Sequence, residues 1–257
     1  MAELKEIKLI LSGCFGKMGR SVIEEVKNFE SIKIIGGIDK HRKNESNFEI
    51  FPIFNKATEI NVNCDVLLDF SSPSALKNIL NFSISKKLPI VICTTGYSNA
   101  QIDDIKNASK FCPIFLAENT SLAINLIKNL SKHIKNVLGK EFDIEIIEKH
   151  HSQKLDAPSG TALMIANAVS EKNTKYNYDR SQSGRRDRNE IGIHSIRGGT
   201  IKGEHEIIFA GKNETITLKH SAGSRSVFAN GALNAVLFIK NKLPGMYCMD
   251  DLEKDKN

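Results

Sequence analysis

Hydrophobic and polar positions in the first half of the chain follow two alternating patterns, short β-rich runs and segments with helical spacing. Five runs rich in isoleucine, leucine and valine predict strands over residues 7–11, 32–38, 66–70, 89–93 and 114–117. The segments between them predict helices over 19–29, from Pro73 onward and over 98–109. Strand–helix–strand alternation is typical of a parallel sheet with crossover helices, so this half predicts an α/β domain.

The second half has fewer helical segments between its strand patterns. An apolar stripe predicts a helix over 121–138, and period-two alternation predicts strands over 142–146, 191–197, 204–209 and 215–220. Such strands are typical of a mixed or antiparallel sheet. An apolar helix pattern over 227–240 precedes a charged tail, 250–257, which we expect to fray. We therefore expect a first domain over 1–120, a smaller α+β domain over 121–226, and a closing segment over 227–257 that returns to the first domain.

Composition restricts the class of protein. The chain has 257 residues, of which 40% are hydrophobic and 26% charged, unlike a disordered, collagen-like or coiled-coil chain. Its apolar runs stay far below the ~20 residues of a membrane span, and its start has no signal-peptide pattern. The five cysteines are scattered and lack CxxC spacing. We therefore expect reduced thiols in a cytoplasmic protein with no membrane partner.

The net charge of +6 is compatible with nucleic acid or with anionic small molecules as partners. Aromatic residues make up only 7% of the chain, tryptophan is absent, and no zinc spacing or helix-turn-helix pattern accompanies the charge. The basic balance therefore favours anionic metabolites, and we expect no nucleic-acid partner.

Three glycines after the first predicted strand have the spacing GxxGxxG, at Gly13, Gly16 and Gly19. Glycines at a strand-to-helix turn let the backbone approach a pyrophosphate, which the exposed amides and the helix dipole then hold. Asp39 ends the second predicted strand, where a carboxylate accepts hydrogen bonds from an adenosine ribose. A plain turn with a surface aspartate is the simpler interpretation, but the position of the loop favours a Rossmann-like dinucleotide site.

The coenzyme stays open between NADH and NADPH. Asp39 favours NADH because its carboxylate repels a 2′-phosphate, but Lys40 and the basic residues after it offset that repulsion, so we expect NADH with NADPH tolerated. Ligands of such sheets bind outside the carboxyl ends of the strands, although ordinary turn chemistry also explains these segments. The expected cofactor-binding residues are Gly13, Cys14, Phe15, Gly16, Lys17, Met18, Asp39, Lys40, Phe70, Ser71, Cys93, Thr94, Thr95, Ala117, Glu118, Asn119 and Thr120.

The segment 148–161 combines proton-transfer groups with an anion site. His150, His151 and Lys154 offer two imidazoles and an ammonium, and the loop at Ser159, Gly160 and Thr161 enters a helix whose amides and hydroxyls suit a carboxylate. Together they predict a small dianionic substrate that undergoes proton transfer. The alternative is a capped helix with solvated His and Lys side chains. Adjacent histidines on a strand point in opposite directions, so we expect no metal.

The run Glu-x-His-His-x-x-Lys-x-Asp-Ala-Pro-Ser-Gly-Thr-Ala resembles the signature of the 4-hydroxy-tetrahydrodipicolinate reductase family, also called dihydrodipicolinate reductase. The resemblance covers nearly the whole chain, and further segments follow in the expected order: 13–20, 69–71, 94–96, 195–199, 203–205 and 224–232. It implies that a reduced nicotinamide passes a hydride to a cyclic, imine-containing dicarboxylate in lysine and diaminopimelate biosynthesis.

The resemblance also implies roles for single residues. His150 is the expected proton donor and acceptor, and Lys154 its catalytic partner. The residues expected to hold the substrate are His151, Ser159, Gly160, Thr161 and Arg225. The family implies a homotetramer built through the substrate-domain sheets. Three departures from the family pattern, Ser72, Cys93 and Glu118, concern the affinity and choice of cofactor rather than the reaction.

Other interpretations remain open at this point. A different two-domain dehydrogenase would act on aspartate or homoserine, and a nicotinamide-sensing regulator would bind the cofactor without turnover. Arg180, Arg185, Arg186 and Arg188 form a basic run that we expect to be a solvated loop, with a tetramer contact or attraction of the acidic substrate as alternatives. The remaining histidines in strand patterns are expected to be structural: His194, His205 and His220.

Overall fold

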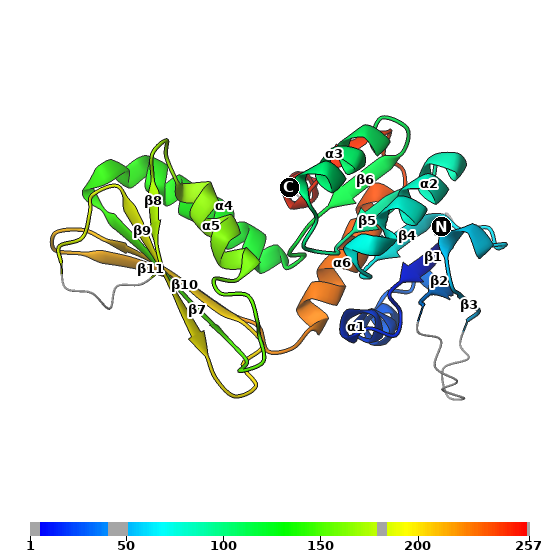
Figure 1. Ribbon diagram of the computed structural model, residues 1–257, viewed down its shortest axis with the longest axis horizontal. Helices are drawn as coiled ribbons and strands as arrows, with labels where there is room; N and C mark the ends of the chain where they lie inside the picture. Colours follow the sequence, from blue (N-terminus) through cyan, green and yellow to red (C-terminus); the bar gives the residue numbers. More distant parts are fainter. Residues whose placement is uncertain (1–5, 41–50, 179–183, 256–257) are drawn as a thin grey trace. The chain divides into compact units, whose positions relative to one another are not determined.

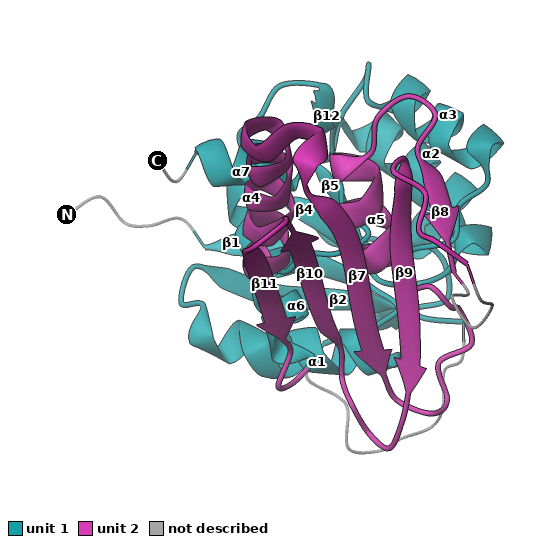
Figure 2. Ribbon diagram, turned by 90° about the vertical axis from the view of Figure 1, so that its left-hand side faces the viewer, with its two compact units in different colours: residues 1–121, 225–257 teal, residues 122–224 magenta. Residues whose placement is uncertain are grey.

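The computed structural model describes residues 6–40, 51–178 and 184–255, and the chain divides into two compact units (Figures 1 and 2). Unit 1 comprises Met1–Ser121 and Arg225–Asn257, and unit 2 comprises Leu122–Ser224. The C-terminal segment therefore belongs to the same unit as the N-terminal part of the chain. Each unit has its own sheet and its own core.

Unit 1 is built on a seven-stranded sheet in the order β12-β6-β5-β4-β1-β2-β3, and every adjacent pair is parallel. The strands are β1 (Ile7–Ser12), β2 (Ile32–Ile38), β3 (Ile53–Phe54), β4 (Val66–Asp69), β5 (Ile90–Ile92), β6 (Pro113–Leu116) and β12 (Gly245–Tyr247). The order reverses beside β1, which is the point where open α/β sheets bind ligands. The predicted Rossmann-like parallel sheet is confirmed, with β3 and β12 as additional edge strands.

Helices and short 3₁₀ turns connect the strands of unit 1. They are α1 (Lys17–Glu25), η1 (Val26–Asn28), η2 (Ala57–Glu59), η3 (Pro73–Ala75), α2 (Leu76–Lys86), α3 (Asn99–Ala108), α6 (Ser226–Ile239) and α7 (Met249–Lys254). Helix α6 contacts α1 and the central strands β4, β5 and β6, whereas α2 contacts α3. The central strands are buried along their length, as their continuous apolar sequences require.

The expectation that residues 250–257 fray is wrong for the part that the structure describes. Residues Met249–Lys254 form α7, and Met249 and Leu252 are buried in unit 1. The carboxylate of Asp251 accepts a hydrogen bond from the backbone N–H of Cys248 at 3.0 Å and so caps the helix. Two buried apolar side chains and this cap outweigh the high charge of the segment.

Unit 2 is built on a five-stranded mixed sheet in the order β11-β10-β7-β9-β8. Its strands are β7 (Asp143–His150), β8 (Lys175–Asn177), β9 (Glu190–Arg197), β10 (Glu204–Ala210) and β11 (Thr215–Ser221). Strand β10 is antiparallel to β7 and β11, whereas β9 is parallel to β7 and β8. Helices α4 (Leu122–Leu138) and α5 (Gly160–Val169) pack on one face, with the short turn η4 (Gly139–Glu141) after α4. The predicted mixed sheet is confirmed.

Strand β7 continues beyond its predicted end at residue 146 and reaches His150. It lies between two partners, since Lys149 pairs with Glu204 of β10 and with Ile196 of β9. Because side chains alternate along a strand, Glu148 and His150 lie on the same buried face as Ile146. The extra residues of β7 therefore bring charged groups into the interior of unit 2.

Arg186 corrects the expectation of a solvated basic loop. Its Nε donates to Glu145 at 3.0 Å, and one terminal nitrogen donates to Asp143 at 2.8 Å. The other terminal nitrogen donates to the carbonyls of Ile144 and Glu190. Arg186 thus ties β7 to the start of β9. Arg185 and Arg188 are exposed, and Arg180 lies outside the described residues.

Candidate active site

The glycine loop of unit 1 is closely packed. Gly13 has a φ of +77°, and a Cβ added there would lie 2.4 Å from the carbonyl oxygen of Phe70. A Cβ on Gly19 would lie 2.2 Å from the carbonyl oxygen of Gly13. The backbone at Gly13 therefore lies directly against the backbone of Phe70, at the end of β4, and the backbone at Gly19 lies directly against that of Gly13. Gly16 caps α1 with no side-chain hydrogen bond, so the first amides of this helix can meet an anion.

A cavity of about 240 Å³ opens beside this loop. Gly13 and Gly16 line one side of it, Asp39 and Lys40 follow from the end of β2, and Phe70 and Ser71 follow from the end of β4. The carboxylate of Asp39 accepts a hydrogen bond from the backbone N–H of Phe15 at 3.1 Å. The structure thus brings six of the predicted cofactor residues to one cavity. Asn55 and Lys56 also line it, and the sequence did not single them out.

Asp69 is a buried carboxyl group at the end of β4, with 1% of its surface exposed. The hydroxyl of Ser71 donates to it at 2.6 Å, and the hydroxyl of Thr94 donates at 2.7 Å. Burial raises the pKa of Asp69, and these hydrogen bonds act in the opposite direction. Asp69 therefore holds the ends of β4 and β5 in one arrangement.

The remaining predicted cofactor residues differ in exposure. Lys17, Thr95 and Glu118 are exposed, Met18 is half-buried, and Cys14, Cys93 and Ala117 are buried. Burial raises the pKa of the Cys14 thiol to about 12, so this thiol is protonated at neutral pH. The hydroxyl of Thr120 donates to the carbonyl of Phe228 at 2.6 Å, and the side chain of Asn119 accepts from the N–H of Ser121 at 2.9 Å.

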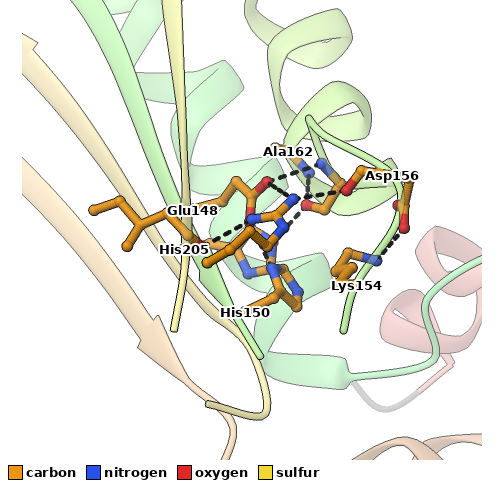
Figure 3. Close-up of polar contacts among 9 residues, drawn as sticks. Glu148, His150, Lys154, Asp156, Ala162 and His205 are labelled. Carbon is orange, nitrogen blue, oxygen red and sulfur yellow. Dashed lines mark hydrogen bonds and ion pairs between the residues drawn. The ribbon is translucent and has the colours of Figure 1, made fainter. Parts of the chain in front are cut away.

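The predicted catalytic histidine of unit 2 is held by a carboxylate (Figure 3). Nδ1 of His150 lies 2.5 Å from an oxygen of Glu148, whose side chain is fully buried. Arg197 donates to both oxygens of Glu148, at 2.7 and 2.8 Å. Burial disfavours the charged carboxylate, but hydrogen bonds from His150 and Arg197 outweigh it and lower the pKa of Glu148 to about 2.

Ser159 connects the carboxylate to the start of α5. Its backbone N–H donates to Glu148 at 3.1 Å, and its hydroxyl accepts from the N–H of Ala162 at 3.2 Å as the helix cap. The same hydroxyl lies 3.1 Å from Nε2 of His205. Burial, together with the nearby charge of His150, lowers the pKa of His205 to about 3, so this ring is neutral at physiological pH.

Lys154 lies in the loop between β7 and α5. Its ammonium group pairs with Asp156 at 2.8 Å, and Figure 3 shows its side chain directed to that carboxylate. His151 is half-buried and follows β7, whereas Gly160 and Thr161 form the first turn of α5. Arg225 lies in unit 1, directly before α6.

Three residues of this cluster were not predicted as site residues: Glu148, Arg197 and His205. The sequence carried a signal for Glu148, because residues i and i+2 of one strand share a face. Arg197 comes from β9 and His205 from β10, and their contacts depend on strand pairing across the sheet. His205 was interpreted as structural, but its ring packs edge-on against His150 with centroids 5.3 Å apart.

The arrangement suits proton transfer beside a bound anion. A buried, ionised carboxylate orients an imidazole, a lysine lies in the adjoining loop, and a helix N-terminus offers amides to a carboxylate. The described part of the chain holds no group of three or more His, Cys, Asp or Glu side chains suited to a metal ion. No helix among the described residues is long and apolar enough to cross a membrane.

Comparisons with known proteins agree along nearly the whole chain. Residues 7–120 match the family described as "Dihydrodipicolinate reductase, N-terminus", and residues 123–252 match its C-terminus. A 4-hydroxy-tetrahydrodipicolinate reductase of Clostridium novyi (strain NT) is 51% identical over 97% of this chain and 99% of its own length. A reductase of the same name from Clostridium tetani (strain Massachusetts / E88) is 50% identical over 95% of this chain and 96% of its own length.

Solved structures share the fold. Dipicolinate-bound dihydrodipicolinate reductase from Paenisporosarcina sp. TG-14 matches with a TM-score of 0.74 at 24% identity, covering 95% of this chain and 97% of that chain. A probable dehydrogenase from Thermotoga maritima matches with a TM-score of 0.66 at 11% identity, covering 96% and 93%. At these identities the likeness concerns the fold.

Proposed function

The chain belongs to the dihydrodipicolinate reductase family, and from this premise we propose that it reduces 4-hydroxy-tetrahydrodipicolinate to tetrahydrodipicolinate with NADH or NADPH. It is thus an oxidoreductase of lysine and diaminopimelate biosynthesis. The observation that carries the proposed chemistry is the contact between Glu148 and His150 beside the capped start of α5. The five free cysteines support a reducing compartment, the cytoplasm.

The lining of the cavity in unit 1 supports a dinucleotide as the ligand. The backbone contacts at Gly13 and Gly19 hold the loop close, and Gly16 leaves the first amides of α1 free of a side chain, as a pyrophosphate requires. Asp39 would accept hydrogen bonds from the adenosine ribose, with Lys40 beside it. The bound nicotinamide supplies the hydride of the reaction. We propose that NADH is preferred, because the carboxylate of Asp39 would repel a 2′-phosphate on the adenosine ribose. NADPH would be tolerated, because the ammonium of Lys40 beside it offsets this repulsion.

His150 would supply the proton of the reaction. Reduction of a conjugated imine leaves an electron-rich carbon that must be protonated, and an imidazole exchanges protons near neutral pH. Glu148 holds Nδ1 of the ring, so Nε2 is the nitrogen free to act. Lys154 would stabilise negative charge on the substrate through its ammonium group, which in the structure pairs with Asp156 and would exchange this carboxylate for the substrate.

The start of α5 would bind a substrate carboxylate. The amides at Gly160 and Thr161 belong to the first helical turn, where the backbone N–H groups have no partner within the helix. Ser159 fixes this turn by capping it. His151 would donate a further hydrogen bond to the dicarboxylate, and Arg225 remains a prediction for the second carboxylate.

We propose a homotetramer built through the sheet of unit 2. Helices α4 and α5 cover one face of the sheet, and Figure 2 shows the strands from the opposite face. Ile147 and Ile208 on that face are half-buried, and Ile196 is 45% exposed. Three isoleucines on the sheet face that α4 and α5 do not cover favour association of this face with a second copy. Sedimentation velocity tests this, and a monomer at micromolar concentration would contradict it.

A coupled assay tests the function. The substrate is generated from pyruvate and aspartate semialdehyde, and loss of NADH or NADPH absorbance is followed. Aspartate and homoserine are tested as comparison substrates with the oxidised coenzyme, and gain of absorbance is followed. We expect oxidation of the reduced coenzyme with the generated substrate alone. His150→Asn and Lys154→Ala should each lower kcat by about 10²–10⁴-fold while NADH binding persists. Turnover of aspartate or homoserine instead, or binding without turnover, would overturn the proposal.

A further inference from the structure

Glu148 is hydrogen-bonded to His150, Arg197, Ser159 and the side chain of Ser195, and the chemistry above uses only its contact with Nδ1 of His150. We propose that Glu148 is a positioning residue that fixes the tautomer of His150, so that Nδ1 carries the hydrogen and Nε2 exchanges protons with the substrate. This inference deepens the proposed function and rests on the proposed role of His150 in proton transfer.

The partners of Glu148 make it an acceptor. Arg197 donates to both carboxylate oxygens, and the backbone N–H of Ser159 donates to one of them. An arginine is always protonated and a backbone N–H cannot accept, so the cation and three donated hydrogen bonds favour an ionised carboxylate. An ionised carboxylate can only accept, so the hydrogen in the contact with His150 must lie on Nδ1.

The surroundings of His150 leave the other nitrogen open. None of the described residues forms a hydrogen bond with Nε2, and a Cβ added to Gly203 would lie 3.2 Å from this atom. Glycine at that position therefore keeps space beside Nε2. The charged and titratable groups around His150 and its neighbour His205 come from four strands and one loop: Glu148 from β7, Arg197 from β9, His205 from β10, His220 from β11 and Lys154 from the loop.

Replacing Glu148 by glutamine should reverse the tautomer. Oε1 of Glu148 accepts from Ser159 and from Arg197, whereas Oε2 accepts from Arg197 and His150. In the glutamine variant, an NH₂ group in the place of Oε1 would face two donors, the N–H of Ser159 and Arg197. In the place of Oε2 it would face only one obligatory donor, Arg197. The amide NH₂ of the substituted glutamine should therefore point to His150 and donate to Nδ1, which then holds no hydrogen. The hydrogen of the neutral ring moves to Nε2.

Nitrogen-15 NMR of histidine-labelled protein, without substrate or coenzyme, tests the inference. His150→Asn identifies the His150 signals, and the spectra are taken at a pH where the ring is neutral. In the wild-type protein we expect hydrogen on Nδ1 and a bare Nε2, and in Glu148→Gln the reverse. Hydrogen on Nε2 in the wild-type protein would overturn the inference even if the variant fails to fold.

Glu145→Gln is the matched control. Glu145 lies on the same strand and pairs with His194 at 2.8 Å and with Arg186 at 3.0 Å, but it faces away from Glu148. This control should leave the His150 signals and kcat at wild-type values. Glu148→Gln should lower kcat by about 10²–10⁴-fold, comparable to the cost of a wrong histidine tautomer elsewhere. The dissociation constant of NADH should not change.

The two hypotheses fail in different ways. If His150→Asn retains kcat while the NMR spectra show the expected tautomers, the role of His150 in the reaction is wrong and the positioning role of Glu148 stands. If the enzyme reduces its substrate but Glu148→Gln leaves the tautomer unchanged, the function stands and the inference is wrong. Glu145→Gln could instead lower kcat and shift the His150 tautomer as much as Glu148→Gln does. That result would show a general effect of changes in strand β7 and would also overturn the inference.

Discussion

The hydroxyl of Thr94 donates a hydrogen bond of 2.7 Å to the carboxyl group of Asp69, which is buried at the end of β4. Ser71 donates to the same carboxyl group at 2.6 Å. Two loops that follow neighbouring strands are therefore joined by one buried side chain, and Ser71 also lines the cavity of unit 1. The relative position of the loops after β4 and β5 therefore depends on the hydrogen bonds that Ser71 and Thr94 both donate to Asp69.

Thr94→Val should loosen this connection. The substitution keeps the branched shape but removes the donor, so an oxygen of Asp69 loses a hydrogen bond inside the protein. We expect the free energy of unfolding to fall by about 1–3 kcal/mol, measured by urea unfolding with far-UV circular dichroism, and the NADH dissociation constant to rise. The exposed neighbour Thr95 provides the control for stability, since Thr95→Val should unfold like the wild-type protein. Equal stability of both variants would contradict the prediction.

Glu148 should make unit 2 sensitive to strong acid. Its pKa falls from an ordinary value of 4.5 to about 2 in the folded chain, because hydrogen bonds outweigh burial. Between these values the unfolded chain binds the extra proton, so the contribution is complete above pH 4.5 and is lost as the pH falls toward 2. The loss amounts to about 3 kcal/mol. Urea unfolding across this range should show a shallower acid dependence in Glu148→Gln, whereas the exposed Glu141→Gln should behave like the wild-type protein.

His205 should act at a higher pH. Burial lowers its pKa from 6.5 to about 3, so the unfolded chain binds a proton between these values while the folded chain does not. Its contribution is complete above pH 6.5 and decreases as the pH falls toward 3, by about 5 kcal/mol in all. His205→Gln should flatten the dependence between pH 6.5 and 4.5, where Glu148 contributes little. His133, exposed on α4, is the control. An unchanged slope in His205→Gln would show that the ring is protonated in the folded protein.

The sequence predicted the parallel sheet of unit 1 well because its central strands are buried on both faces and consist of continuous apolar residues. The edge strands β3 and β12 escaped prediction, since each has three residues or fewer and forms through pairing with a longer neighbour. Segment 250–257 was misjudged because two apolar residues, Met249 and Leu252, anchor an otherwise charged helix.

The candidate site shows why sequence patterns miss some functional residues. The apolar alternation predicted strand β7 only over 142–146. In the structure the next inward positions of β7 are Glu148 and His150, and such residues usually face solvent. Their burial is possible because Arg197, from a distant part of the chain, compensates the carboxylate. The local sequence pattern around Glu148 gives no indication of Arg197, so the burial of this carboxylate could not be predicted from it. The predicted His150 and Ser159 are brought together through Glu148, whereas Arg225 belongs to the other unit.

Gly19 and Gly16 should respond differently to the same substitution. A Cβ on Gly19 would meet backbone atoms of Gly13 and Cys14 at 2.2 and 2.7 Å, which cannot move aside as a flexible side chain would. Gly19→Ala should therefore lower the free energy of unfolding by about 3 kcal/mol or more. A Cβ on Gly16 would meet only the carbonyl oxygen of Gly13, at 3.2 Å, and Gly16 has the extended backbone of an ordinary residue.

Gly16→Ala should accordingly change stability by less than about 1 kcal/mol. It adds a methyl group to a residue that lines the cavity, where a pyrophosphate would approach the amides of α1. We expect the dissociation constant of NADH to rise about tenfold or more, which corresponds to at least about 1.4 kcal/mol. Urea unfolding and coenzyme titration of both variants separate the two effects. If Gly16→Ala binds NADH as the wild-type protein does, the glycine loop does not hold the pyrophosphate, and the proposed orientation of the coenzyme along α1 is wrong.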